Sequence, residues 1–136
     1  PLVAMWNSWH TAESVSYQVR VVDIERALQP LRAERERSFT LLLRDDDCPW
    51  NDGLFEVALT RDGCSVGRST DTVRSPGPGG ADVATDVATL AAVLFGAIDP
   101  AAALATGLAE GDLATLTDLA RLVGGRPCFV SEADHF

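Results

Sequence analysis

The sequence predicts an α+β domain in which helices pack on one face of a mostly antiparallel sheet of about five strands. Three observations predict this class. The first part of the chain alternates apolar and polar residues as half-buried strands do, and the last part carries complete helix boundary signals. The chain has 136 residues and is 46% hydrophobic, which is enough for one hydrophobic core. We therefore expect residues 1–136 to form a single domain, with 1–15 as a linker or N-terminal arm.

Strands around one short helix are predicted in the first third of the chain. Residues 16–23 alternate apolar and polar side chains, which predicts a half-buried strand. In residues 23–37, Ile24, Ala27, Leu28 and Leu31 stand at helical spacing; Asp23 can cap the first turn, and Pro30 limits how regular the helix can be beyond Leu28. Residues 38–44 are apolar on both faces, which is typical of a central strand.

A hairpin and a loop are predicted next. Residues 54–60 and 64–68 are the two hairpin strands, because Arg61-Asp62-Gly63 between them is a turn sequence. Residues 69–80 contain two prolines and three glycines, which predicts a flexible loop. Residues 83–87 alternate again like a strand.

Three helices are predicted after this strand. An aspartate can cap each of the last two, a proline follows the first of these caps, and a glycine ends every helix. The predicted ranges are about 88–95, 100–106 and 113–123. Strands that come first and helices that come last favour helices layered on a sheet.

Composition argues against several classes of function. The formal net charge is −9 and the arginines are scattered, so nucleic acid is a poor partner. The longest apolar run, "LAAVLFGAI", is too short to span a bilayer, and the first residues lack the pattern of a signal peptide. Cys48, Cys64 and Cys128 suggest no disulfide framework and fit the cytoplasm. His10 and His135 lie at opposite ends of the chain, so no metal site is expected.

The stretch "DDDCPWNDG", from Asp45 to Gly53, joins two predicted strands and admits three interpretations: a metal site, a catalytic loop or a decorated hairpin. A calcium loop needs carboxylates at alternate positions, whereas these three aspartates are contiguous. A catalytic carboxylate needs surroundings that shift its pKa, which exposed loop acids rarely have. We therefore expect at least two of the three aspartates to be solvated loop charges. Trp50 is expected to cover the core, with a pocket mouth or a subunit contact as the alternative.

Four segments together resemble a known family. "YQVRVVDIERAL", "LLLRDDDCPWNDGLFEVAL", "ADVATDVATLAAVLFG" and the closing helix are similar to the C-terminal domain of the enhanced intracellular survival acetyltransferases. That domain has a sterol-carrier-protein type 2-like fold. The resemblance runs from about Tyr17 to Cys128, and its most specific part is the order strand, "CPWN", glycine, strand.

The resemblance implies a function for the longer protein. In that family this domain follows two acetyltransferase-type domains, and the enzyme, often a hexamer, transfers acetyl from acetyl-CoA to amines. The chain would then have a structural and assembly role, as part of a possible homo-oligomer. By the same resemblance Phe136 would supply its terminal carboxylate as a catalytic base, after Pro127 and Cys128. The "PGPGG" loop lacks a helix that could receive a pyrophosphate, so this chain alone is expected to bind no cofactor.

Two alternatives remain open at this stage. The chain could be a stand-alone sterol-carrier-like protein that holds a lipid or another hydrophobic molecule between sheet and helices. It could also be a small biosynthetic enzyme on this scaffold, with Asp47, Tyr17, His10 or His135 as acid or base, although their spacing forms no triad. The candidate ligand-binding residues are mostly large apolar side chains that are also expected to build the core. They are Trp50, Phe55, Val93, Leu94, Phe95, Leu104 and Leu116.

Overall fold

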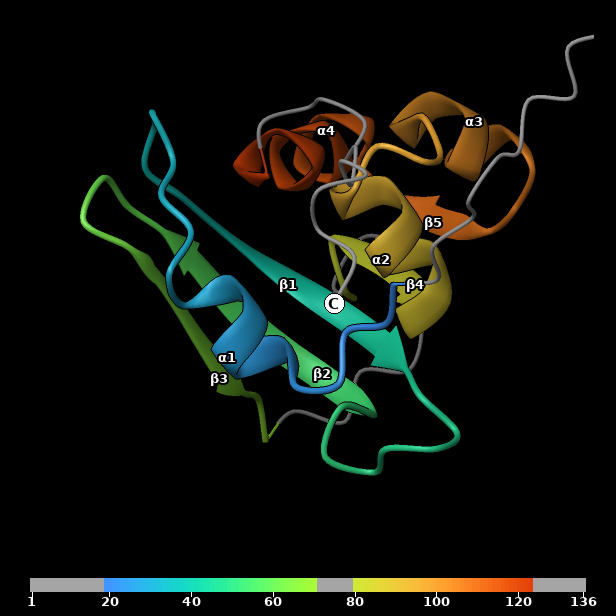
Figure 1. Ribbon diagram of the computed structural model, residues 1–136, viewed down its shortest axis with the longest axis horizontal. Helices are drawn as coiled ribbons and strands as arrows, with labels where there is room; N and C mark the ends of the chain where they lie inside the picture. The colour runs from blue at the N-terminus through green and yellow to red at the C-terminus, as the bar shows by residue number, and fades with distance from the viewer. Residues whose placement is uncertain (1–18, 71–79, 124–136) are drawn as a thin grey trace, which may run out of the picture.

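The described residues form one five-stranded sheet (Figure 1). The computed structural model describes residues 19–70 and 80–123. The strands lie in the order β3-β2-β1-β4-β5, so that β1 is central as the sequence predicts. Their bounds are Arg37–Arg44 (β1), Gly53–Leu59 (β2), Cys64–Arg68 (β3), Val83–Asp86 (β4) and Ala109–Gly111 (β5).

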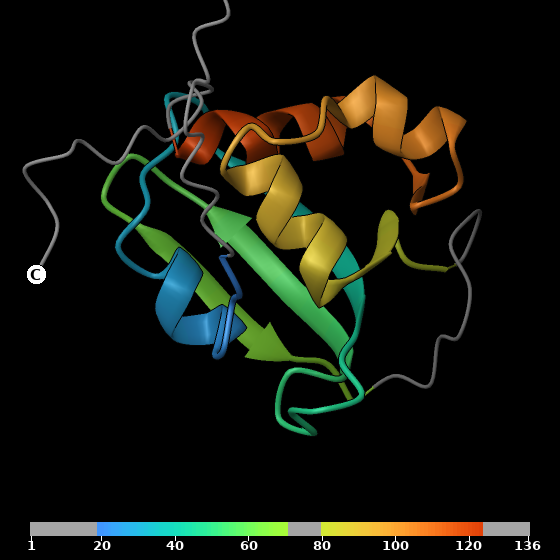
Figure 2. The same cartoon turned by 45° about the vertical axis from the view of Figure 1, so that its right-hand side comes forward.

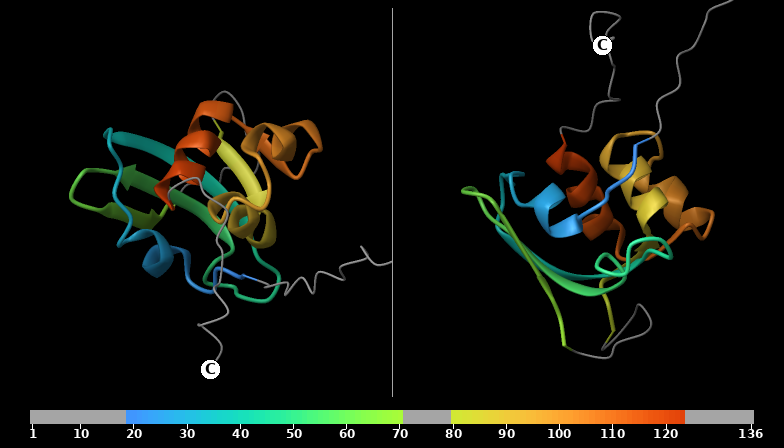
Figure 3. Two further views of the ribbon diagram at one scale, coloured as in Figure 1. Left: turned by 45° about the horizontal axis from the view of Figure 1, so that its top comes forward. Right: turned by 60° about the horizontal axis from the view of Figure 1, so that its bottom comes forward.

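Four described helices lie on one face of this sheet (Figure 3). They are Ile24–Leu28 (α1), Val87–Leu94 (α2), Pro100–Ala105 (α3) and Leu113–Leu122 (α4). Each begins after an aspartate whose carboxylate accepts a hydrogen bond from a backbone N–H of the first turn, as N-cap residues do. Among the described helices none is long and apolar enough to cross a membrane.

Three of the four strand pairs are antiparallel. The predicted hairpin is confirmed, with Val57 opposite Val66 in β2 and β3, and β1 pairs with β2 so that Leu41 lies opposite Phe55. On its other side β1 pairs in parallel with β4, and Leu41 lies opposite Val83. The sheet is therefore mostly antiparallel, and the α+β class is confirmed.

The hydrophobic core lies between this sheet and the helices. In Figure 2, α2 and α4 lie on the same side of β1 and β2. From the sheet, Leu41, Phe55 and Val83 are completely buried, and from the helices Leu90 and Leu116 are completely buried. Since the side chains of a strand alternate between two faces, the apolar residues at every second position of β1 and β2 all point into this core.

The segment before α1 differs from the prediction. Residues 16–18 lie outside the described residues, and 19–23 form no strand. Val21 is buried while Val19, which a strand would place on the same face, is exposed. The backbone carbonyl of Val21 accepts its hydrogen bond from the side chain of Asn51 and not from a neighbouring strand. The loop between β1 and β2, which contains Asn51, thus holds this segment in place.

Two further features were not predicted. The short strand β5 has a three-residue sequence, "AEG", which carries no strand pattern, and it forms because it lies beside β4. No local pattern in the sequence indicates that β4 pairs in parallel with β1. The proposed arm at 1–15 and residues 71–79 of the proposed loop lie outside the described residues.

Candidate functional site

The loop between β1 and β2 surrounds one buried carboxylate. Asp45 is 4% exposed, unlike Asp46 and Asp47, which are exposed. Its Oδ1 accepts hydrogen bonds from Arg20 (2.5 Å) and from the backbone N–H groups of Asp47 and Cys48 (both 3.1 Å). Its Oδ2 accepts one from the amide of Asn51 (3.0 Å). Both carboxylate oxygens of Asp45 are therefore occupied by protein donors.

Asn51 joins this loop to the residues that lead into α1. Its side chain is completely buried, its Oδ1 accepts from the backbone N–H of Ile24 (2.9 Å), and its Nδ2 donates to the carbonyl of Val21 (3.1 Å). The indole of Trp50 donates to the carbonyl of Val22 (2.7 Å). We call Arg20, Asp45, Trp50 and Asn51, with the backbone of residues 21–24, the clasp.

Several opposing effects act on the pKa of Asp45. Burial alone would raise this pKa, since it penalises the charged form. Hydrogen bonds from Asn51 and from the backbone of Cys48 and Asp47, together with the charge of Arg20, outweigh burial and lower it. A carboxylate that stays ionised and fully hydrogen-bonded is a poor proton carrier. Of the three interpretations of this loop, the geometry supports a hairpin connection between β1 and β2, which also holds the residues that lead into α1.

Of the candidate acid or base residues, the structure describes Asp47. Tyr17, His10 and His135 lie outside the described residues, as does Phe136. Asp47 lies at the surface, where its carboxylate forms an ion pair with Arg20 at 3.0 Å. Within residues 19–70 and 80–123, no group of three or more histidine, cysteine or acidic side chains could hold a metal ion.

The candidate ligand-binding residues divide into three groups. Phe55, Val93, Leu94 and Leu116 belong to the buried core, and Phe95 and Leu104 pack against it while partly buried. Trp50 is 60% exposed, so its ring does not cover the core as the sequence suggested. The hydrogen bond from its indole fixes the ring at the surface beside Val22 instead.

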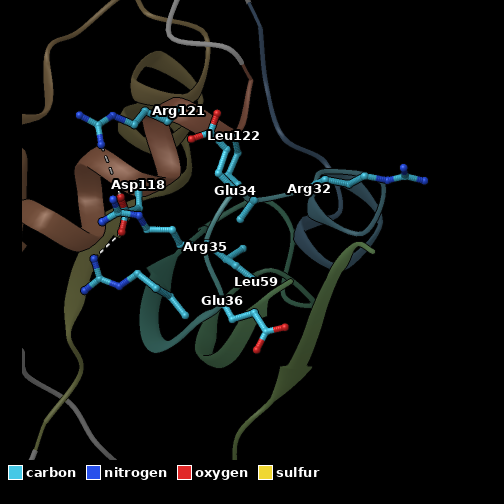
Figure 4. Close-up of a pocket in the computed structure, with 10 residues that line it drawn as sticks. Arg32, Glu34, Arg35, Glu36, Leu59, Asp118, Arg121 and Leu122 are labelled. Carbon is cyan, nitrogen blue, oxygen red and sulfur yellow. Dashed lines mark hydrogen bonds and ion pairs between the residues drawn. The ribbon is translucent and has the colours of Figure 1, made fainter. Parts of the chain in front are cut away.

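A cavity of about 800 Å³ lies elsewhere, between the segment that leads into β1 and helix α4 (Figure 4). No candidate residue from the sequence lines it. Its lining is Arg32, Ala33, Glu34, Arg35, Glu36, Arg37, Leu59, Asp118, Arg121 and Leu122. The segment "LRAERER" follows Pro30, beyond which the sequence predicts an irregular helix, and no local pattern indicates that it faces α4.

Asp118 organises the charged wall of this cavity. Its carboxylate accepts a hydrogen bond from Arg37 through Oδ2, and Arg121 approaches Oδ1 at 3.9 Å. Figure 4 shows Arg35 extending to the same side as Asp118 and Arg121, whereas Arg32 extends away from them. Ala33, Leu59 and Leu122 supply apolar surface beside the charges.

Comparisons with known proteins agree with this architecture. The sequence profile described as "Sterol carrier protein domain" matches residues 24–131. No curated protein matches the chain. Among solved structures, a GCN5-related N-acetyltransferase from Kribbella flavida is similar, with 22% identity and a TM-score of 0.62 over 79% of this chain and 27% of that chain.

Two other structures are similar to the same degree. Eis1 from Mycobacterium abscessus has 23% identity and a TM-score of 0.58 over 80% of this chain and 26% of its own. A protein of unknown function from Enterococcus faecalis V583, described as a probable N-acyltransferase, has 19% identity and a TM-score of 0.62 over 76% and 25%. The chain thus spans about a quarter of the length of these proteins, and the likeness concerns the fold.

Proposed function

Because this chain belongs to the sterol carrier protein domain family, we propose that it is the sterol-carrier-like C-terminal module of an acetyl-CoA-dependent N-acetyltransferase. One observation carries the proposal: more than three quarters of the chain matches about a quarter of the length of acetyltransferase structures. A segment that fits in this way has the dimensions of one domain of such an enzyme. In this proposal the acetyl-CoA site belongs to upstream domains.

The clasp supports a role as a module. The chain that arrives at Arg20 is fixed by an ion pair to Asp45, by two hydrogen bonds of Asn51 and by one of Trp50. Residues just before the first helix of an independent domain are usually among the least restrained. Here they are tied to a loop of the sheet, which would set the direction from which a preceding domain joins.

The proposed role is structural and concerns assembly, with one chemical contribution. By the family resemblance, the carboxylate of Phe136 would act as a base in the active site of the complete enzyme. The packing of Phe55 and Leu116 into the described core fits a module that supports other domains.

The size of the native polypeptide in its own cells tests the proposal directly. An antibody raised against this chain should detect a product several times longer, and a product of this length would refute it. The isolated chain, incubated with acetyl-CoA and an amine, should form no acetylated product, whereas the complete polypeptide should form it.

Binding of a hydrophobic molecule is the second candidate, and the family description favours it. The ligand would separate the sheet from helices α2 and α4, near Phe55, Val93 and Leu116. A fluorescent fatty acid titrated into the folded chain gives saturable binding if this candidate is correct. A fluorescence signal that rises linearly without saturation, and equally in buffer without protein, would contradict it.

A further inference from the structure

We propose that the cavity between residues 32–37 and α4 binds a small organic phosphate, through Arg35, Arg37 and Arg121. This site is separate from the proposed module function, because its arginines belong neither to the clasp nor to the core. It lies in a protein of formal net charge −9, yet its lining has four arginines against three acidic residues.

The charges on this wall do not balance among themselves. Three arginines extend to one wall and Asp118 is the acid between them, while Figure 4 shows Glu36 extending away from that group. Glu34 also lines the cavity, and Figure 4 shows its carboxylate beside Leu122 on the side of Arg121, so three guanidinium groups face two carboxylates and one positive charge is left over. A phosphate monoester offers three acceptor oxygens to these guanidinium groups, whereas a monocarboxylate offers two.

The hydrogen-bond donors of the arginines are also not used up. A guanidinium group has five N–H donors. Arg121 lies 3.9 Å from the carboxylate of Asp118, which is beyond hydrogen-bond distance, so that pair is an ion pair alone. Within the described part of the chain, no hydrogen bond or ion pair holds the guanidinium of Arg35. Arginine can offer two parallel N–H groups to phosphate oxygens, which makes it well suited to such a ligand.

The size of the cavity indicates more than a bare phosphate ion. Its volume of about 800 Å³ lies in the range of sites for small organic molecules. The apolar side chains of Ala33, Leu59 and Leu122 form part of the lining. An apolar body attached to the phosphate would contact these side chains while the arginines hold the anionic end.

Two interactions fix the segment that supplies most of the arginines. The backbone N–H of Ala33 donates to the carbonyl of Thr60 (3.0 Å), and Arg61 donates to the carbonyl of Glu34 (3.4 Å). On the other wall, α4 begins at its cap Asp112 and buries Leu116 and Leu119 in the core. Both walls are therefore attached to the core, so part of the binding geometry exists before a ligand arrives.

Phenyl phosphate is a suitable probe for calorimetric titration of the full chain. We expect one saturable site with a dissociation constant of about 1 mM or tighter, which is reasonable for a ligand of this size. Inorganic phosphate and benzoate should each bind more weakly, because one lacks the apolar body and the other carries a single charge. Affinity should fall about tenfold from pH 7.5 to pH 5, since the second pKa of a phosphate is near 6.

Substitutions locate the site. Arg35→Ala and Arg121→Ala should each weaken phenyl phosphate binding about tenfold or more, since each removes a charge-assisted contact. Arg44→Ala is the matched control, because Arg44 is an exposed arginine on β1 that does not line the cavity. The proposal is overturned if binding is not saturable, if Arg44→Ala weakens it as much as the cavity variants do, or if benzoate binds as tightly as phenyl phosphate. Circular dichroism of each variant excludes a loss of folding as the cause.

Discussion

Asp45 and Asp118 both pair with arginine, but their surroundings differ. Asp45 in the clasp is buried, and donors of the protein occupy both of its oxygens. The side chain of Asp118 in the cavity wall is 26% exposed and lies between arginines that outnumber it. The same two residue types therefore form a closed structural tie in one region and an open charged wall in the other.

Because of this difference, substitutions in the two regions should have different measurable effects. Removing a buried hydrogen-bonded group leaves other polar groups unsatisfied and lowers the stability of the fold. Removing an exposed arginine changes stability little but changes the local field. Clasp variants should act on the free energy of unfolding, and cavity variants should act on ligand affinity.

The largest expected effect is that of Asn51→Ala. This substitution removes three hydrogen bonds and leaves the Val21 carbonyl and the Ile24 N–H without their partner. We expect a loss of about 3 kcal/mol in the free energy of unfolding, measured by urea denaturation. Asp46→Asn, in the exposed part of the same loop, should change it by less than about 0.5 kcal/mol. Equal effects of the two variants would show that the clasp does not stabilise the fold.

The second largest effect is expected from acid, which should lower the stabilisation that the clasp provides. The pKa of Asp45 is lowered in the folded protein, and so is that of Asp112, mainly by hydrogen bonds from Thr115. A group whose pKa is lower in the folded state stabilises the fold above its unfolded pKa, here 3.8, and this contribution is lost as pH falls through the folded pKa. The free energy of unfolding should thus decrease below roughly pH 4.

The contribution of Asp45 to this acid effect can be isolated. The variant Asp45→Asn keeps the shape of the side chain but cannot take up a proton in this range. Its free energy of unfolding, measured by denaturant at several pH values, should decrease less steeply below pH 4 than that of the native chain. Parallel curves for the two proteins would assign the acid effect to other groups.

The smallest effect on stability is expected in the cavity wall. Arg121→Ala should change the free energy of unfolding by less than about 0.5 kcal/mol, because the side chain is largely exposed and its ion pair is long. Thermal denaturation of this variant beside Asn51→Ala makes the comparison direct. A loss as large as that of Asn51→Ala would place Arg121 among the structural residues of the fold.

Much of the fold could be predicted because its signals are local. Asp99 and Pro100 begin α3, and Asp-Gly at the turn separates β2 from β3, all within a few residues of the elements that they bound. The parallel position of β4 could not be predicted, because it depends on contacts with residues about forty positions earlier. Residues 19–23 have the sequence pattern of a strand but form none, and Val21 is buried while Val19, which a strand would place on the same face, is exposed.

The candidate site was less predictable for a physical reason. The cavity combines residues 32–37 with Asp118 and Arg121, which only the packing of α4 brings together. The buried state of Asp45 was equally hidden, because three adjacent aspartates have the same local sequence signal. What distinguishes Asp45 is Asn51, whose side chain reaches both this carboxylate and the backbone before α1.

The parallel pairing of β4 has a consequence for the order of folding. The hairpin β2–β3 and its neighbour β1 can assemble through contacts that are close in sequence, which form quickly. Joining β4 to β1 closes a much larger loop, since Thr40 and Asp82, which are hydrogen-bonded, lie 42 positions apart. Because the entropy of closing a loop grows slowly with its length, insertions between β3 and β4 should slow this step more than they weaken the final structure. The two halves of the sheet are thus kinetically unequal, although they share one core.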